Sequence, residues 1–154
     1  MRLIFLTARA GNGAQPKIKI MKKTYCVTSA IIKNGDKFFK AKRAETKKFA
    51  PGHWEFISGF IEDHQAAEDT IIKELKEEIN AEGTIEKVLD IYQFGDEDGR
   101  WIVVPFIVSV KDPNIYTNPS EHSEGKWVTW EELEQIPQPD LQEQLGRLKK
   151  LLAE

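Results

Sequence analysis

The segment GFIEDHQAAEDTIIKELKEEINA, residues 59–81, does most to determine the fold. Its apolar residues recur every four positions, a spacing that lines one face of an α-helix. They are Ala67, Ile71, Leu75 and Ile79, with Ile72 beside them. We therefore predict a helix over residues 65–80 that packs this face against a core. Asn80 ends it, because asparagine tolerates the left-handed conformation found just past a helix C-terminus.

The same segment carries three glutamates on one side of the predicted helix. Glu74, Glu77 and Glu78 occupy positions i, i+3 and i+4. Glu74 and Glu78 form a like-charge pair, which destabilises an isolated helix by about 0.2–0.5 kcal/mol. A divalent cation between them would reverse that sign, and Mg²⁺ prefers carboxylate oxygens. The alternative is a solvated acidic face, and spacing alone leaves both interpretations open.

The flanking sequence predicts strands on both sides of this helix. Asn34-Gly35 is typical of a two-residue hairpin turn, and Ser58-Gly59 indicates another turn. The predicted strands cover residues 24–33, 37–43, 54–56, 84–94, 100–110 and 126–129. The order of hairpin, strand, helix, strands and helix predicts an α/β fold. We expect an α/β/α sandwich with a mixed β-sheet flanked by helices.

Two capping patterns predict the C-terminal helices. Thr129-x-x-Glu132 has the form of a capping box that opens a helical turn. Asp140-x-x-Glu143 is the second such pattern and predicts a cap on the last helix. The apolar face of that helix consists of Leu141, Leu145, Leu148 and Leu152. Residues 112–125 read as a long polar loop between strands.

Composition limits the classes of function. The 154 residues suit one domain, and the single cysteine, Cys26, excludes an internal disulfide and is expected to be a small buried side chain. Residues 1–23 carry six basic and no acidic side chains, which leaves 16 basic against 25 acidic residues in the remainder. An acidic body disfavours binding to a nucleic-acid polymer. No apolar run approaches the roughly 20 residues of a membrane helix.

We therefore expect a cytoplasmic monomer or homodimer with no membrane partner. The predicted domain covers residues 21–154. Residues 1–20 form a leader that fits several interpretations. It is a tail or an extended start ahead of Met21, an extra edge strand, or a transit peptide.

Residues 59–81 resemble the Nudix box, G-x5-E-x7-R-E-U-x-E-E-x-G-U, in which U is a bulky aliphatic residue. The spacing is intact across the segment, and Trp54 to Glu62 is similar to the W-E-F-P-G-G-x-x-E lead-in of MutT-type members. The likeness extends from residue 21 to about 145. The departures are Gln65 for glutamate, Lys73 for arginine, Asn80 for glycine, Ile57 for proline and Ser58 for glycine.

The resemblance implies a Mg²⁺-dependent hydrolase of phosphoanhydride bonds, with Mn²⁺ as a substitute ion. It assigns catalytic roles to Glu74, Glu77, Glu78 and Glu121. The same four side chains, with the backbone carbonyl of Ser58, are the implied metal ligands. Glu121 is the implied further ligand or general base, with Glu124 as a substitute and a solvated loop carboxylate as the alternative.

The resemblance also suggests the substrate contacts. Arg43 matches a position where MutT-type proteins use arginine near the substrate, and Lys47 and Lys48 would screen the outer phosphates. Asp140 lies near the position that reads the base edge, where an ionised aspartate would favour a base with N–H donors. The alternative for Arg43, Lys47 and Lys48 is an ordinary solvated basic loop, and the alternative for Asp140 is a helix N-cap. Three aromatic side chains could stack on the base, and packing in the core is the alternative for each. They are Phe49, Trp54 and Phe94.

Two function classes remain. The first is a pyrophosphohydrolase of a small nucleotide, most simply a nucleoside triphosphate that gives a monophosphate and pyrophosphate. The second is a Nudix-fold nucleotide-binding or regulatory module in which Gln65 and Lys73 impair catalysis, because they cannot form a bidentate Arg–carboxylate pair. The histidines show no paired metal-ligand spacing and are expected on the surface. They are His53, His64 and His122.

Overall fold

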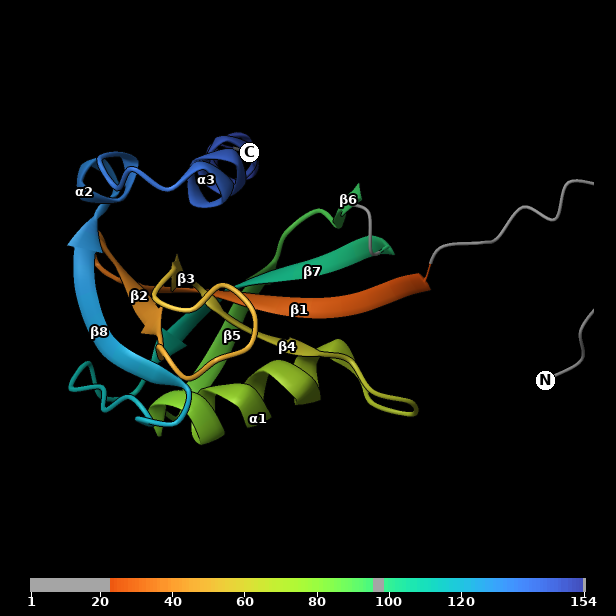
Figure 1. Ribbon diagram of the computed structural model, residues 1–154. Helices are drawn as coiled ribbons and strands as arrows, with labels where there is room; N and C mark the ends of the chain where they lie inside the picture. Colours follow the sequence, from red (N-terminus) through yellow and green to blue (C-terminus); the bar gives the residue numbers. More distant parts are fainter. Residues whose placement is uncertain (1–22, 96–98, 154) are drawn as a thin grey trace, which may run out of the picture.

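A mixed β-sheet forms the middle layer of the protein (Figure 1). The computed structural model describes residues 23–95 and 99–153, and the predictions for residues 1–20 lie outside this part of the chain. Eight strands are present in the described residues. They are β1 (Lys23–Asn34), β2 (Lys37–Arg43), β3 (Trp54–Glu55), β4 (Ile57–Phe60), β5 (Gly83–Val88), β6 (Tyr92–Gly95), β7 (Gly99–Val110) and β8 (His122–Thr129).

Strand β1 is the axis of this sheet. It runs parallel to β7 along most of its length, from Lys23 opposite Gly99 onwards, whereas the other strand pairs are antiparallel. On its second edge β1 pairs first with β4 and then, beyond Ile32, with β2. The sheet therefore divides at β1 into one wing with β4 to β7 and another with β2, β3 and β8.

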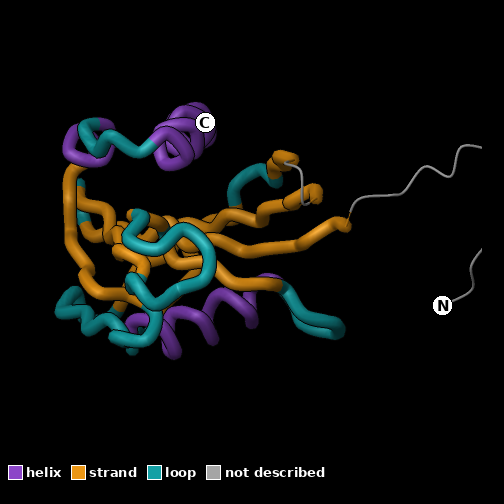
Figure 2. Tube along the Cα trace, in the orientation of Figure 1, coloured by secondary structure: helices purple, strands orange, loops and turns teal. Residues whose placement is uncertain are grey.

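Helices cover both faces of the sheet, as Figure 2 shows by colour. The helices are α1 (Ala67–Ile79), α2 (Trp130–Glu134) and α3 (Pro139–Leu152). Alternate residues of β1 point to opposite faces, so Ala30 and Ile32 pack in the α1 core whereas Ile31 packs in the α3 core. The predicted α/β/α sandwich is confirmed. None of the helices in the described ranges is long and apolar enough to cross a membrane.

Helix α1 has the predicted buried stripe. Ile71, Leu75 and Ile79 are fully buried, whereas Ile72 at the edge of the stripe is partly exposed. Asn80 follows the helix with φ 49° and ψ 35°, and its N–H donates to the carbonyl of Leu75. The left-handed conformation predicted for this asparagine is thus confirmed.

Long-range pairing changes several predicted boundaries. Ser58 and Gly59 form part of β4 instead of a turn, because they pair with Ser29 and Thr28 of β1. The predicted strand over residues 84–94 divides into β5 and β6, and β8 begins at residue 122 inside the predicted polar loop. Helix α3 begins at Pro139 with Gln138 as its N-cap, so Asp140 lies in the first turn and is not the cap.

Cys26 is exposed, contrary to the prediction of a buried side chain. It belongs to the alternation that faces α1, but β1 extends beyond the end of that helix (Figure 1). A strand pattern alone does not show where the covering helix stops.

The predicted capping box at Thr129 is present. The Thr129 hydroxyl accepts from the Glu132 N–H at 3.3 Å, and the Glu132 carboxylate accepts from the Thr129 N–H at 2.7 Å. Thr129→Ala is expected to lower the free energy of unfolding by about 1 kcal/mol, since a helix donor loses its acceptor. Urea unfolding followed by circular dichroism measures this. Thr129→Ser keeps the oxygen and should unfold like the wild type, so equal losses in both variants would contradict the capping role.

Candidate active site

The carboxylates of α1 border an open pocket of about 390 Å³. Glu78 is the most enclosed of them, with 13% of its side chain exposed, whereas Glu77 is 58% exposed. Burial, followed by the negative charges of Glu74, Glu55 and Glu121, raises the pKa of Glu78 to about 9. The pocket is lined by Glu74, Glu77, Glu78, Asn118 and Glu121. The predicted acidic cluster is therefore brought together in space.

Glu74 depends on the neighbouring strand β4 for its place. Its carboxyl group hydrogen-bonds that of Glu78, and burial together with the charge of Glu77 raises its pKa. A Cβ atom on Gly59 would lie 2.5 Å from Cγ and Oε1 of Glu74. The absence of a side chain at Gly59 thus makes room for the carboxylate. Ser58, the predicted backbone ligand, precedes Gly59 in the same strand.

Asn118 connects the loop before β8 to the C-terminal end of α1 by hydrogen bonds. Its N–H donates to the Glu78 carbonyl at 2.7 Å, and its side-chain amide donates to the Glu77 carbonyl at 3.3 Å. The Asn118 carbonyl accepts in turn from the N–H groups of Glu121 and His122, at 2.9 and 2.8 Å. Asn118 therefore brings Glu121 to the pocket. Sequence reasoning missed this residue, because asparagine in a polar loop has no distinctive spacing.

Glu121 is held by a lysine from the loop after β2. Lys47 Nζ lies 2.5 Å from Glu121 Oε2, and both side chains are about one-third exposed or less. The ammonium group of Lys48 lies 5.7 Å from the centre of the exposed Phe49 ring. Glu124, the predicted substitute for Glu121, pairs with Lys126 and does not line the pocket. Only Lys47 of the two lysines reaches the acidic cluster.

Arg43 is not among the residues that line the acidic pocket, and its guanidinium group is already hydrogen-bonded within the protein. Its Nη1 atom donates to both carboxylate oxygens of Glu55, at 3.0 and 3.2 Å, and its Nε atom donates to the Phe49 carbonyl at 2.9 Å. These bonds join the end of β2 to β3 and to the loop that carries Lys47. Glu55 is a site residue that sequence reasoning did not select.

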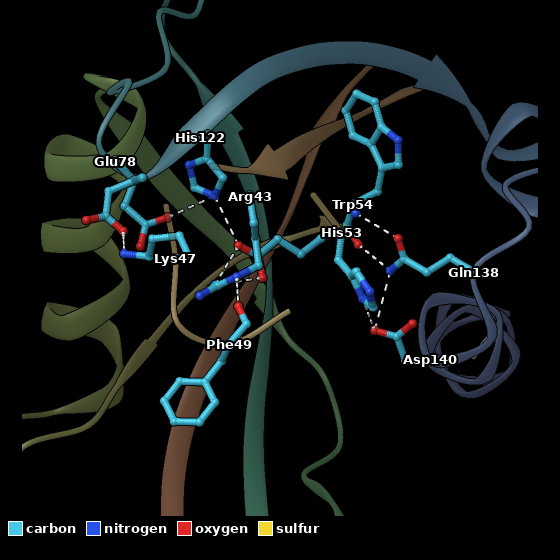
Figure 3. Close-up of polar contacts among 11 residues, drawn as sticks. Arg43, Lys47, Phe49, His53, Trp54, Glu78, His122, Gln138 and Asp140 are labelled. Atoms are coloured by element: carbon cyan, nitrogen blue, oxygen red, sulfur yellow. Dashed lines mark hydrogen bonds and ion pairs between the residues drawn. The ribbon is translucent and has the colours of Figure 1, made fainter. Parts of the chain in front are cut away.

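His122 is buried, so the prediction of a surface residue is wrong. Only 2% of it is exposed, and its Nε2 atom lies 3.1 Å from Glu55 Oε1 and 3.7 Å from Glu78 Oε2 (Figure 3). The cause is the early start of β8, where His122 pairs with Arg43 of β2 at a bulge. This pairing places a residue of the predicted loop beside Glu78.

A second polar group lies at the N-terminus of α3. The side-chain amide of Gln138 makes two 2.8 Å hydrogen bonds to the main chain of Trp54, one with the N–H and one with the carbonyl. Asp140, 63% exposed, lies 3.3 Å from His53 Nδ1. Figure 3 places Asp140 and His53 on the far side of Arg43 from Glu78. The predicted base-reading residue is therefore separate from the acidic cluster.

The aromatic residues considered for base stacking have different surroundings. Trp54 packs against the α3 core and faces the ammonium groups of Lys40 and Lys126. Phe49 is 71% exposed, and Phe94 is partly exposed and stacks on Trp101. Of the three, only Trp54 is packed against the core.

The chain matches a known protein family over most of its described length. A model of the NUDIX domain matches residues 24–152. This chain belongs to the NUDIX family. As a Nudix hydrolase, it is an enzyme that acts on pyrophosphate bonds, and the resemblance of its central segment to the Nudix box reflects a true relationship.

Individual Nudix proteins are similar over much of their length. The CTP pyrophosphohydrolase of Escherichia coli is 30% identical over 111 residues, which cover 72% of this chain and 80% of that protein. The MutT protein of Methanosarcina mazei has a TM-score of 0.72 at 19% identity, over 86% of this chain and 99% of that one. The E. coli ORF135 protein has a TM-score of 0.61 at 26% identity, over 76% and 81%.

Nudix hydrolases generally use divalent metal ions, and the residues of the pocket suit such an ion. Their donors are carboxylate oxygens, which Mg²⁺ prefers, and the room left by Gly59 lies directly against one of them. No three His, Cys, Asp or Glu side chains within residues 23–95 and 99–153 are already arranged around one metal position. Glu74 hydrogen-bonds Glu78, and Glu121 pairs with Lys47.

Gln65 and Lys73, which replace the glutamate and arginine of the Nudix box, form no ion pair or hydrogen bond with each other within the described residues. Gln65 accepts from the Thr70 hydroxyl at 3.3 Å, near the start of α1. Lys73 lies 3.9 Å from Glu77 on an exposed face. These positions support the start and the surface of the helix, whereas the carboxylates themselves are positioned by Gly59 and Asn118.

Proposed function

We propose that this Nudix hydrolase cleaves a nucleoside triphosphate to a nucleoside monophosphate and pyrophosphate in a Mg²⁺-dependent reaction. The acidic pocket between α1 and the Asn118 loop carries this proposal, because four carboxylates converge there without enough cations to balance them. Its volume of about 390 Å³ falls in the range of small-ligand sites. A polyphosphate enters such a pocket only together with positive charge.

In this proposal the metal ligands are the helix glutamates, the loop glutamate and one main-chain carbonyl. They are Glu74, Glu77, Glu78, Glu121 and the carbonyl of Ser58. A divalent ion held by these groups supplies positive charge to the phosphoryl oxygens and makes a nearby water more acidic. Mn²⁺ is expected to replace Mg²⁺, since both accept carboxylate and carbonyl oxygens.

Lys47 and Glu121 would exchange partners when substrate enters. The phosphates compete for the Lys47 ammonium group, which is now 2.5 Å from the Glu121 carboxylate. Glu121 is then free to ligate the ion or to take a proton from the attacking water. Lys48 lies one residue further on the same loop and can screen the outer phosphates. Arg43 adds positive charge beside the pocket while it holds this loop through the Phe49 carbonyl.

Asp140 is proposed to contact the base. An ionised carboxylate only accepts hydrogen bonds, so it favours a base with an exocyclic amino group over uracil. The 30% identity to a protein named CTP pyrophosphohydrolase makes cytosine nucleotides the first substrates to test. His53, 3.3 Å from Asp140, would help to keep this carboxylate in place.

A panel of CTP, dCTP, UTP, ATP and GTP with Mg²⁺ tests both the reaction and the base contact. We expect pyrophosphate release with a CTP preference over UTP. Asp140→Asn, whose amide also donates, should reduce the ratio of kcat/KM for CTP over UTP by at least about tenfold, because a hydrogen-bonding site then accepts both bases. His64→Asn, an exposed change away from this group, is the matched control.

Either of two results would contradict this proposal. If Asp140→Asn leaves the ratio of kcat/KM for CTP over UTP unchanged, Asp140 does not contact the base. No turnover of any nucleotide, together with a nucleotide-dependent rise in melting temperature, would favour the catalytically impaired binding module suggested by Gln65 and Lys73.

A further inference from the structure

His122 lies between two carboxylates, one on strand β3 and one on helix α1. Its Nε2 atom is 3.1 Å from Glu55 Oε1 on β3 and 3.7 Å from Glu78 Oε2 on α1. Carboxylates that lie this close to one shared atom repel each other unless a donor lies between them. A carboxylate that has given up its proton to bind a metal ion only accepts, so we assign the hydrogen to Nε2, the nitrogen that lies within hydrogen-bond distance of Glu55.

The other ring nitrogen makes no competing contact. His122 Nδ1 is buried and has no hydrogen-bond partner within the described part of the chain. The orientation of the imidazole therefore depends on the contacts at Nε2. In Figure 3 the Nε2 side of the ring faces Glu78 and Arg43.

The main chain around His122 is fixed on both sides. Its N–H donates to the Asn118 carbonyl at 2.8 Å, and the preceding carbonyl, of Glu121, accepts from Ala44 at 2.9 Å. On the far side of Glu55, the guanidinium of Arg43 bonds both carboxylate oxygens. A continuous chain of polar contacts thus runs from Arg43 through Glu55 and His122 to Glu78.

We propose that His122 is a positioning residue that directs the Glu78 carboxylate into the metal site. Its Nε2 atom hydrogen-bonds Glu55 and lies 3.7 Å from Glu78 Oε2, so it links the Arg43–Glu55 pair to the end of α1. This role rests on the proposed metal-dependent hydrolysis. His122 contributes through the orientation of Glu78 and touches neither the substrate nor the reacting water.

Two variants distinguish the effect of the hydrogen-bond donor from the effect of side-chain volume. His122→Gln places an amide donor near the position of Nε2, whereas His122→Leu fills space without a donor. Isothermal titration with Mn²⁺ in the absence of nucleotide should show a loss of about 10–100-fold in affinity for His122→Leu, the usual effect of removing a partner of a metal ligand. His122→Gln should recover most of this affinity. His64→Asn, which replaces an exposed histidine, should bind Mn²⁺ like the wild type.

Unfolding in EDTA shows whether packing explains the result. A metal affinity that stays at the wild-type level in His122→Leu, or an equal loss in the Leu and Gln variants, would overturn the positioning role. Should His122→Leu fail to fold, His122→Asn is the second test, since its shorter amide is polar but does not reach Glu78.

The wild-type protein separates this inference from the proposed function. Mn²⁺ binding without turnover of any nucleotide contradicts the proposed reaction alone. Turnover with unchanged metal affinity in His122→Leu contradicts the role of His122 alone. Absence of Mn²⁺ binding by the wild type contradicts both.

Discussion

Glu78→Gln is expected to lower kcat on the preferred nucleotide by on the order of a thousandfold. A divalent ion contributes several kcal/mol of charge stabilisation in the transition state, and each 1.36 kcal/mol corresponds to a factor of ten. Glu78 is the most buried carboxylate of the pocket, and glutamine offers one neutral oxygen in its place. Pyrophosphate release at saturating Mg²⁺ measures the loss. Glu77→Gln, at a position 58% exposed on the same helix, should lose much less.

The same variant should make the metal-free protein more stable. In the folded chain the pKa of Glu78 rises from 4.5 to about 9, chiefly through burial. The unfolded chain then releases this proton more readily than the folded one, so the free energy of unfolding falls as pH rises through that interval. Glutamine has no such titration. The melting-temperature advantage of Glu78→Gln in EDTA should therefore widen from pH 5 to about 9.

A melting-temperature difference that does not change with pH would contradict this account of Glu78. Substantial turnover by Glu78→Gln would show that Glu78 is not a required metal ligand. A gain in stability with a loss of activity would show that the arrangement of carboxylates serves the reaction at the expense of the fold.

Gly59→Ala is expected to reduce kcat/KM by about a hundredfold with a smaller effect on stability. The new methyl group would lie 2.5 Å from Cγ and Oε1 of Glu74, so this side chain must rotate out of its place. Overpacking of this kind destabilises a protein by about 1–3 kcal/mol. A displaced carboxylate, however, no longer faces Glu78. Parallel measurements of nucleotide hydrolysis and urea unfolding separate the two effects.

Gly146→Ala is the matched control for this substitution. Gly146 lies within α3, and a Cβ atom there would meet nothing within 4 Å. Alanine should stabilise that helix by up to about 1 kcal/mol and leave hydrolysis unchanged. Wild-type activity in Gly59→Ala would mean that Glu74 accommodates the methyl group and that its present position is not required.

The helix and its carboxylates could be predicted because their signals are local. Ile71, Leu75 and Ile79 repeat at the period of a helix, and Asn80 is one of few residues suited to the conformation that ends it. The shared face of Glu74 and Glu78 follows from the same period. Such features depend only on neighbouring residues, and the structure keeps them together.

The remainder of the site depends on pairing between distant strands. His122 enters the site because β8 extends to meet Arg43 at a bulge, and Glu55 enters because β3 pairs with β2. Asn118 contributes mainly through contacts with the last turn of α1. None of these residues stands out by spacing or by type, so a reading of local pattern assigns them to loops or to the surface.

The double hydrogen bond of Gln138 to Trp54 has a consequence for how substrate preference can diverge. It fixes the start of α3 to the sheet through the side chain of Gln138 and the main chain of Trp54, and the further 3.4 Å contact of the Gln138 amide with Asp140 is longer than either of these two 2.8 Å bonds. Position 140 is also exposed and remote from the carboxylates. With the proposed base contact at Asp140, exchange of this one residue would change the preferred nucleobase and leave the carboxylates in place, so selectivity could evolve separately from catalysis.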